Sequence, residues 1–339
     1  MTEVLFVDDD PTMLRALERS LKRSVRGWSG AYVTSGASAL AHCERAHVDV
    51  IVSDIGMPEM DGMALLSQIR TRYPAITRII LSGEARSEQR SRAVATVHQW
   101  VAKPARLAKL AETITLVAAA RSLLGVGGGG GGMAAVCGVT CLPTPPETAA
   151  KLTAAISDGA RMNELVAIVE TDIAWTAKLL QVANSAFFGD PECVTSVAAA
   201  AGVLGVDRLR ELLDSPELRC VDARATAVVA RGRHLANAVR SIAAPEIAER
   251  VEVAALLHEV GDLIALEDGD GHGGAGTGDG LNSGGGDIPS ARLGGALLGT
   301  WGLPASIVTA VAYARDPDAA PDPSDPVLRA VSAAYAAMR

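Results

Sequence analysis

Acidic, hydroxyl and lysine side chains follow apolar runs at four places in the first 103 residues. Asp8 and Asp9 come after residues 4–7, Asp54 after 48–53, Ser82 after 76–81, and Lys103 after 98–101. Clustered carboxylates repel one another unless a cation binds them, and Mg²⁺ prefers such oxygen ligands and shares its remaining positions with phosphate. A lysine and a hydroxyl would then contact other phosphoryl oxygens. These residue types predict a phosphoryl-transfer site in which one carboxylate is the nucleophile.

The elements that would position these groups alternate along the first 120 residues. Apolar, strand-like runs at 4–7, 31–34, 48–53, 76–81 and 98–101 are each followed by a segment with helical periodicity. Strand–helix units in series predict a parallel sheet with helices on both faces. With right-handed crossovers the sheet is doubly wound, and its working site lies beyond the carboxyl ends of the strands. The candidate groups all fall at that edge.

These segments resemble the CheY-like receiver domain of two-component response regulators. The matching pieces are FVDDDP at 6–11, SDIGMP at 53–58, MDG at 60–62, LSG at 81–83 and WVAKP at 100–104. Taken singly, an Asp-Asp pair also fits a helix cap and a Lys-Pro pair also fits a loop. Their occurrence together, in order and at successive strand ends, favours the receiver. The resemblance implies a flavodoxin-like, five-stranded α/β domain over residues 1–122.

The resemblance also implies a role for each residue of the site. Asp54 is the phosphoacceptor, and a sensor histidine kinase is the donor. Mg²⁺ is held directly by Asp9, through water by Asp8, and by Asp54 and the Gly56 carbonyl. Ser82 contacts the phosphoryl group and acts with Trp100 as the switch, while Lys103 pairs with the phosphate. Ordinary packing is the alternative explanation for Trp100.

A run of six glycines at 127–132 separates two parts of the chain. Glycines bury no side chain and have great backbone freedom, so we predict a flexible tether within a linker at 123–133. Residues 134–339 then form a second domain. Helical periodicity dominates there, for example over 224–242 and 247–267, which predicts an all-α domain.

The second part resembles the HDOD domain, a signalling relative of HD phosphohydrolases. The resemblance rests on LLQVANSAFFG at 179–189, GVLGVDRLR at 202–210, LLHEVGDL at 256–263 and WGLP at 301–304. A second glycine-rich stretch, 269–286, is predicted to be a disordered surface insertion. It follows the segment in which an HD enzyme would carry metal ligands.

The HD-like residues predict a degenerate, non-catalytic site. HD enzymes hold metal with a histidine, an adjacent His-Asp pair and a later aspartate, and the metal activates water. His234 and His258 could serve as two ligands, but Glu259 replaces the aspartate, and Arg315 lies where further histidines are expected. Packing of His258 within a buried helix is the simpler explanation. The alternative is a receiver-regulated, metal-dependent phosphohydrolase that acts on a nucleotide messenger.

Charge and cysteine content limit the classes of molecule that the protein is expected to bind. The net charge is −8, made up of +2 over residues 1–120 and −10 over 121–339, which argues against direct DNA binding by the second part. The five scattered cysteines form no C-x-x-C pair, and no apolar run reaches the roughly 18 residues of a membrane span. We therefore predict a cytoplasmic response regulator whose output domain binds a downstream signalling protein or nucleotide ligand. A homodimer through the receiver is left open.

Overall fold

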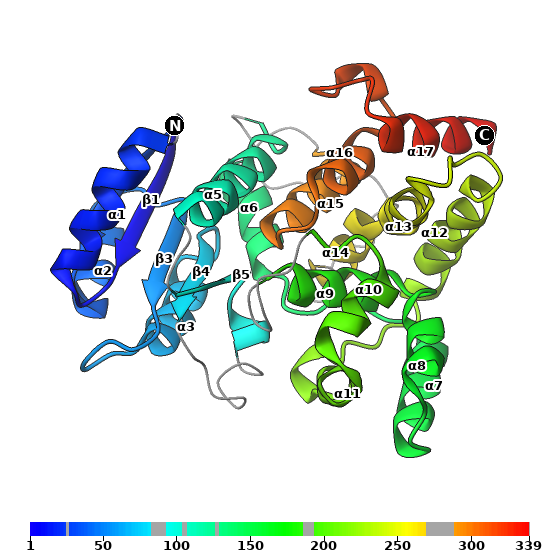
Figure 1. The fold of residues 1–339 in the computed structure, drawn as a ribbon, viewed down its shortest axis with the longest axis horizontal. Helices are drawn as coiled ribbons and strands as arrows, with labels where there is room; N and C mark the ends of the chain where they lie inside the picture. The colour runs from blue at the N-terminus through cyan, green and yellow to red at the C-terminus, as the bar shows by residue number, and fades with distance from the viewer. Residues whose placement is uncertain are drawn as a thin grey trace.

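The computed structural model describes residues 1–24, 27–82, 93–103, 107–125, 129–185, 193–268 and 288–338. A five-stranded parallel sheet occupies the N-terminal part, in the order β2-β1-β3-β4-β5 (Figure 1). The strands are β1 (Thr2–Val7), β2 (Trp28–Val33), β3 (Val50–Asp54), β4 (Thr77–Ser82) and β5 (Gln99–Ala102). The helices of this part include α1 (Pro11–Ser24), α2 (Gly36–Cys43), α3 (Gly62–Arg72) and α5 (Leu107–Ser122). The predicted doubly wound α/β fold is confirmed.

Alternating apolar residues fill both faces of this sheet. Leu5 and Ile51 pack in one cluster with residues of α2 and α3. Phe6 and Val52, their neighbours along the strands, pack in a second cluster with residues of α1 and α5. Because successive strand residues point to opposite faces, the sheet can be buried on both sides only if both sets are apolar.

Helices make up the C-terminal part, as predicted. They are α6 (Gly129–Gly138), α7 (Pro146–Ser157), α8 (Met162–Val169), α9 (Ile173–Asn184), α10 (Val197–Leu204), α11 (Val206–Asp214), α12 (Ala225–Val239), α13 (Ala248–Leu257), α14 (Val260–Asp268), α15 (Ser290–Thr300), α16 (Ala305–Tyr313) and α17 (Pro326–Ala337). Short 3₁₀ turns lie at Pro216–Leu218 and Pro317–Ala319. Within the described ranges, no helix is both long and apolar enough to cross a membrane.

The single helix predicted over 247–267 is wrong, because the structure divides it into α13 and α14. His258 and Glu259 lie at the break. After the break, α14 packs so closely on α15 that a Cβ on Gly261 would collide with the backbone of Ser290. The change of direction that allows this contact depends on a residue far along the chain, which helical periodicity does not reveal.

The predicted flexible tether is also corrected in part. Gly129–Gly138 forms helix α6, whereas residues 126–128 lie outside the described residues. A Cβ on Gly132 would lie 2.7 Å from Cδ1 of Ile288, so this glycine permits a close packing contact. Met133 is buried in the main hydrophobic cluster. The glycine-rich insertion at 269–286 falls outside the described residues.

Two receiver-side groups cap the C-terminal end of α6. Arg78 Nη2 donates to the Cys137 carbonyl oxygen over 2.8 Å, and His98 Nε2 lies 3.2 Å from the same oxygen. The last carbonyls of a helix have no partner within the helix, and its dipole is negative there. Burial lowers the pKa of Arg78 to about 10, which still leaves it cationic at neutral pH. The cap therefore ties α6 to β4 and β5.

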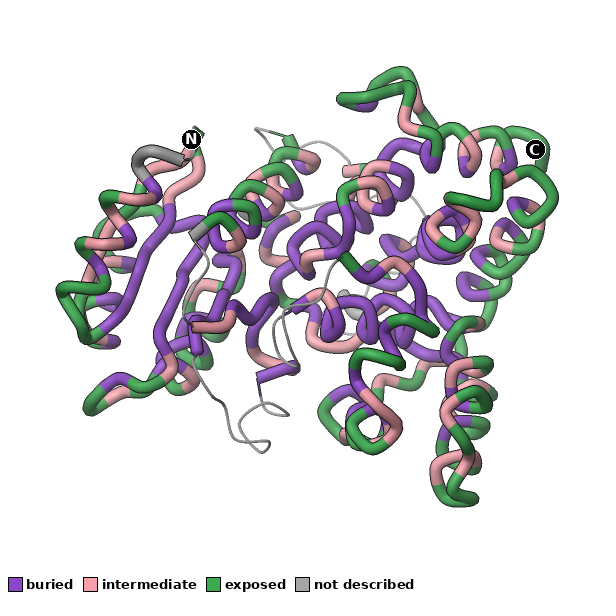
Figure 2. Tube along the Cα trace, in the orientation of Figure 1, coloured by how far each residue is buried: buried purple, intermediate pink, exposed green. Residues whose placement is uncertain are grey.

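The sheet and the helical part share one continuous hydrophobic cluster. Helix α15 lies against α5, and a Cβ on Gly299 would be 2.7 Å from the Cβ of Ala120. Buried residues continue from the sheet through α9 and α15, whereas exposed residues concentrate on outer elements such as α1, α7 and α8 (Figure 2). The two parts thus pack directly against each other.

Candidate functional sites

Three of the predicted residues meet at the carboxyl edge of the sheet. Asp54 ends β3, Asp8 follows β1, and Lys103 follows β5. The Lys103 ammonium lies 2.6 Å from Oδ1 of Asp54 and 2.9 Å from Oδ2 of Asp8. The parallel sheet therefore brings together groups that are up to 95 residues apart in sequence.

The two carboxylates of this cluster are buried, and Lys103 balances their charge. The Asp8 side chain is 3% exposed and that of Asp54 12%. Burial alone would lower the pKa of Lys103, but hydrogen bonds to Asp54 and Asp8 raise it above its usual value. The amide of Gly56 donates to Oδ2 of Asp54 over 3.1 Å, so the Gly56 backbone also belongs to the site. The charged lysine compensates two carboxylates that would otherwise repel each other.

Ser82 ends β4 beside this cluster and has an unused hydroxyl. Its Oγ is buried, and among the residues that the structure describes it has no hydrogen-bond partner. Buried hydroxyls are normally hydrogen-bonded, so this one calls for an explanation. Contact with a phosphoryl group, the predicted role of Ser82, would supply an acceptor.

The predicted Mg²⁺ ligands are only partly assembled in this arrangement. Asp9 is exposed, and among the residues that the structure describes no three acidic, histidine or cysteine side chains are grouped to hold a metal. The ammonium of Lys103 instead lies between Asp8 and Asp54. The oxygen donors fit a hard cation such as Mg²⁺ in kind.

Trp100 lies on the edge strand β5 and is 4% exposed. Its backbone N–H donates to Oγ of Ser185, at the end of α9, over 2.8 Å. Its side chain belongs to the hydrophobic cluster shared with the helical part. The predicted switch residue is thus at the boundary between the two parts. The sequence did not identify Ser185 as its partner, although Ser185 lies within the 179–189 run on which the HDOD resemblance rests.

A second buried carboxylate, Glu259, lies at the break between α13 and α14. Arg231 Nη2 lies 2.9 Å from its Oε2, and Arg315 Nη2 lies 3.1 Å from its Oε1. His258 Nε2 is 2.8 Å from the same Oε1. Burial would raise the pKa of Glu259, but contacts with His258, Asp262 and Arg231 hold it well below its usual value. The carboxylate is therefore ionised and surrounded by cationic or hydrogen-bonding groups.

The structure does not bring all the HD-like residues together. His258 is buried, with its Nδ1 3.2 Å from the Ala255 carbonyl oxygen. His234 is exposed on α12, and in the described part of the chain it makes no hydrogen bond or ion pair with His258 or Glu259. Arg231, one turn earlier on α12, reaches Glu259 instead. Sequence reasoning missed the contacts of both arginines because they come from 28 and 56 residues away.

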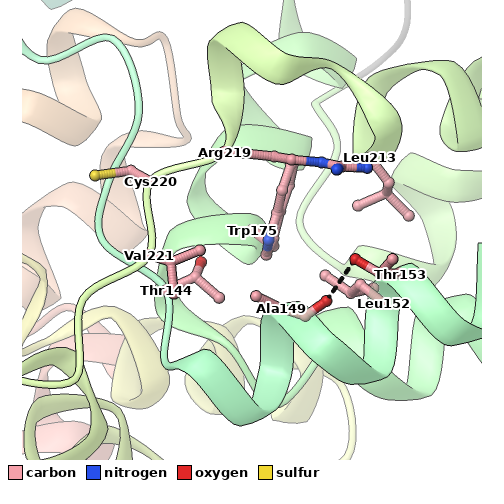
Figure 3. Close-up of a pocket in the computed structure, with 9 residues that line it drawn as sticks. All are labelled: Thr144, Ala149, Leu152, Thr153, Trp175, Leu213, Arg219, Cys220 and Val221. Atoms are coloured by element: carbon pink, nitrogen blue, oxygen red, sulfur yellow. Dashed lines mark hydrogen bonds between the residues drawn. The ribbon is translucent and has the colours of Figure 1, made fainter.

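A small cavity of about 150 Å³ lies elsewhere in the helical part (Figure 3). In this view Trp175 stands at its centre and Arg219 crosses above it. The remaining lining residues are Thr144, Ala149, Leu152, Thr153, Leu213, Cys220 and Val221. Arg219 is paired with Asp214, and the lining contains no carboxylate or histidine. The cavity therefore lacks the groups that acid–base or metal chemistry would need.

Behind this cavity, Asp172 caps the N-terminus of α9. Its Oδ1 accepts hydrogen bonds from the amide of Trp175 and the hydroxyl of Thr144. Within the described ranges its Oδ2 is buried without a partner, and burial raises the pKa of Asp172 to about 6. In contrast to Asp54 and Glu259, this carboxyl group forms no ion pair with a cation in the part of the chain that the structure describes.

Comparison with known proteins gives two family matches. Residues 4–115 match the response regulator receiver domain, and residues 142–268 match the HDOD domain. The chain is 40% identical over 79 residues to the transcriptional regulatory protein GlrR of Escherichia coli, which is 23% of this chain and 17% of GlrR. It is 36% identical over 105 residues to the transcriptional regulatory protein KdpE of Mycobacterium tuberculosis, which is 31% of this chain and 45% of KdpE.

The alignment thus spans less than half of each of these two relatives. Among solved structures, the chemotaxis response regulator CheY4 of Vibrio cholerae is 28% identical, with a TM-score of 0.32. That comparison covers 34% of this chain and 97% of CheY4.

Proposed function

The chain carries a response regulator receiver domain followed by an HDOD domain, and we propose that phosphorylation of Asp54 in the first controls a non-catalytic second. The observation that carries this proposal is the ion-paired cluster of Asp54, Asp8 and Lys103 beside the unpartnered hydroxyl of Ser82. A sensor histidine kinase is the proposed phosphoryl donor. GlrR and KdpE are named as transcriptional regulators, but the acidic second part of this chain supports an output other than DNA binding.

The chemistry follows from this cluster. One carboxylate oxygen of Asp54 attacks the phosphorus atom, while the bond from phosphorus to the kinase histidine nitrogen breaks and its electron pair stays on that nitrogen. Lys103 turns from Asp54 to a phosphoryl oxygen, and the Ser82 hydroxyl donates to another. Mg²⁺, held by Asp8, Asp9, Asp54 and the Gly56 carbonyl, supplies additional charge neutralisation when bound.

The arginines around Glu259 support a binding role for the HDOD domain. In an HD enzyme the corresponding carboxylate is available to a metal. Here Arg231 and Arg315 contact both oxygens of Glu259, and His234 lies apart from it. Trp100, packed against the helical part, supports transmission of the phosphorylation signal through the contact between the two domains.

The central proposal is tested by labelling the full chain with radioactive acetyl phosphate and Mg²⁺. We expect labelling of the wild type and none of Asp54→Ala, because Asp54 is the less buried of the two carboxylates paired with Lys103 and lies closer to its ammonium, at 2.6 Å against 2.9 Å for Asp8. Asp61→Asn changes an exposed carboxylate seven residues away that caps α3, and it should be labelled like the wild type. Labelling that survives Asp54→Ala would refute the phosphoacceptor assignment.

The phosphohydrolase alternative has its own test. Wild-type protein and His258→Ala would be incubated with Mn²⁺ or Mg²⁺ and a panel of nucleotide phosphoesters. The binding-module proposal predicts no phosphate release that depends on His258. Release that His258→Ala abolishes would instead establish catalysis at the HD-like site.

A further inference from the structure

The outer edge of the receiver sheet is covered by side chains of α9. Among the strands that the structure describes, β5 pairs only with β4, so one side of its backbone has no strand partner among them. Trp100 turns both its N–H and its C=O to that side, where Ser185 Oγ accepts from the first over 2.8 Å and donates to the second over 3.3 Å. One hydroxyl thereby makes both hydrogen bonds that a neighbouring strand would make.

A second residue of α9 extends this contact by one turn. Gln181 Nε2 donates to the carbonyl oxygen of His98 over 3.0 Å. The other end of the same amide, Oε1, accepts from the ammonium of Lys178 over 2.7 Å. Lys178 is itself held over the ring of Trp301, 4.1 Å from its centroid. The Gln181 amide is thus pre-oriented, with its donor aimed at the strand backbone.

The end of α15 contacts the side chain that alternates with Trp100. Gln99 Nε2 donates to the carbonyl oxygen of Thr300 over 2.9 Å. Gly302 has a φ of +80°, which favours glycine, and a Cβ there would lie 2.9 Å from Oε1 of Gln99 and push this side chain away. The HDOD domain therefore contacts both the backbone and the side chains of a single extended strand.

We infer that Gln181, Ser185 and the backbone of Thr300 form a binding face for the free edge of a β-strand, which β5 of the receiver occupies in this structure. The face binds backbone groups, which every extended chain presents, and the side chain at the position of Trp100 is buried in the hydrophobic cluster that the sheet shares with the helical part. The downstream partner is accordingly an extended peptide or a sheet edge with an aromatic or large aliphatic residue. This inference rests on the proposed function in one respect, namely that phosphorylation uncovers the face.

The test uses the full chain and a fluorescein-labelled peptide that copies residues 97–103, with binding followed by fluorescence anisotropy. The unphosphorylated wild type should bind weakly, because β5 competes at the high effective concentration of a linked domain. The receiver variant Gln99→Ala/Trp100→Ala, which weakens that competition without phosphate, should bind the peptide at least tenfold more tightly. A peptide with glycine at the tryptophan position should not bind.

Substitutions of Ser185 and Gln181 test whether the peptide binds at this face. In the Gln99→Ala/Trp100→Ala background, Ser185→Ala and Gln181→Ala should each weaken peptide binding at least tenfold, whereas Ser185→Thr, which keeps the hydroxyl, should retain it. Failure of the opened chain to gain affinity, or undiminished binding by Ser185→Ala, would overturn the inference. If the opened chain binds but the acetyl phosphate-treated wild type does not, the face is supported and the proposed control by phosphorylation is refuted.

Discussion

Asp54 and Glu259 are both buried carboxylates paired with cations, yet their surroundings differ in what they leave available. The partner of Asp54 is one lysine, a compact charge on a flexible chain, and the nearby Ser82 hydroxyl is unused. The partners of Glu259 are two arginines from separate segments, whose planar guanidinium groups fix the carboxylate from two sides. Charge pairing is common to both sites. The Asp54 site, which is proposed to react, differs in having the Ser82 hydroxyl as an available donor and a lysine that can move.

The largest effect is expected from Glu259→Ala. Removal of this carboxylate leaves Arg315 and the buried His258 without their anion and leaves Arg231 with Asp262 alone, and loss of one partner of a buried ion pair costs about 3–5 kcal/mol. Because both arginines are partly exposed, we expect the lower end, a loss of about 3 kcal/mol in the free energy of unfolding by urea. Glu252→Ala, which removes a more exposed pair with Arg240, should cost below about 1 kcal/mol. Equal costs would show that the Glu259 cluster is an ordinary surface network.

An effect that reaches a similar size only at acidic pH is expected at Asp172, which has no cationic partner among the described residues. Its pKa is raised from 3.8 to about 6, so the folded state holds the proton more tightly than the unfolded state does. The resulting stabilisation is fully present below about pH 4 and is lost as pH rises through about 6, a change of up to about 3 kcal/mol.

Asp172→Asn should remove most of this pH dependence, because the amide keeps the cap oxygen but does not ionise. The measurement is urea unfolding of both proteins at pH 4.5 and pH 7.5. Asp61→Asn, at another aspartate helix cap, controls for the exchange of carboxylate for amide. A variant that keeps the full wild-type pH dependence would mean that another group is responsible.

The smallest stability effect is expected at Ser82. Its hydroxyl has no partner, so Ser82→Ala should change the unfolding free energy of the unphosphorylated protein by less than about 0.5 kcal/mol. Phosphorylation by acetyl phosphate should nevertheless slow several-fold, since a donor to the phosphoryl group is lost. Ser53→Ala is the matched control, because this buried hydroxyl donates to the Asp54 carbonyl oxygen and its removal should cost about 1 kcal/mol. A destabilised Ser82→Ala protein would contradict the spare-donor interpretation.

The receiver could be predicted well from sequence because its geometry is generic. Parallel strands end at one edge, so residues placed after them, such as Asp8, Asp54 and Lys103, must meet. The HD-like cluster could not be predicted in the same way. Whether Arg231 and Arg315 reach Glu259 depends on how α12 and the turn after α16 pack around α13, and no local pattern encodes that packing.

The glycine-rich segment illustrates the same limit. Glycine disfavours a helix by about 1 kcal/mol per residue, so the local sequence favours a coil at 129–132. A helix nevertheless forms there. It is stabilised by the packing of Gly132 against Ile288 and by Arg78 and His98, which cap the carbonyl of Cys137. Tertiary contacts thus override local propensity, and a single sequence does not display them.

The dependence of α6 on that cap has a consequence for how far the two domains can separate. If the receiver undocks, Arg78 and His98 leave the end of a helix that begins with four glycines, and α6 keeps only its packing against the helical part, such as Gly132 on Ile288, to offset its poor propensity. Ten residues span about 15 Å as a helix and up to about 34 Å when extended. The connecting segment would then lengthen as its helix melts. Melting of this helix would let the two domains explore a volume roughly ten times larger than the helical segment allows.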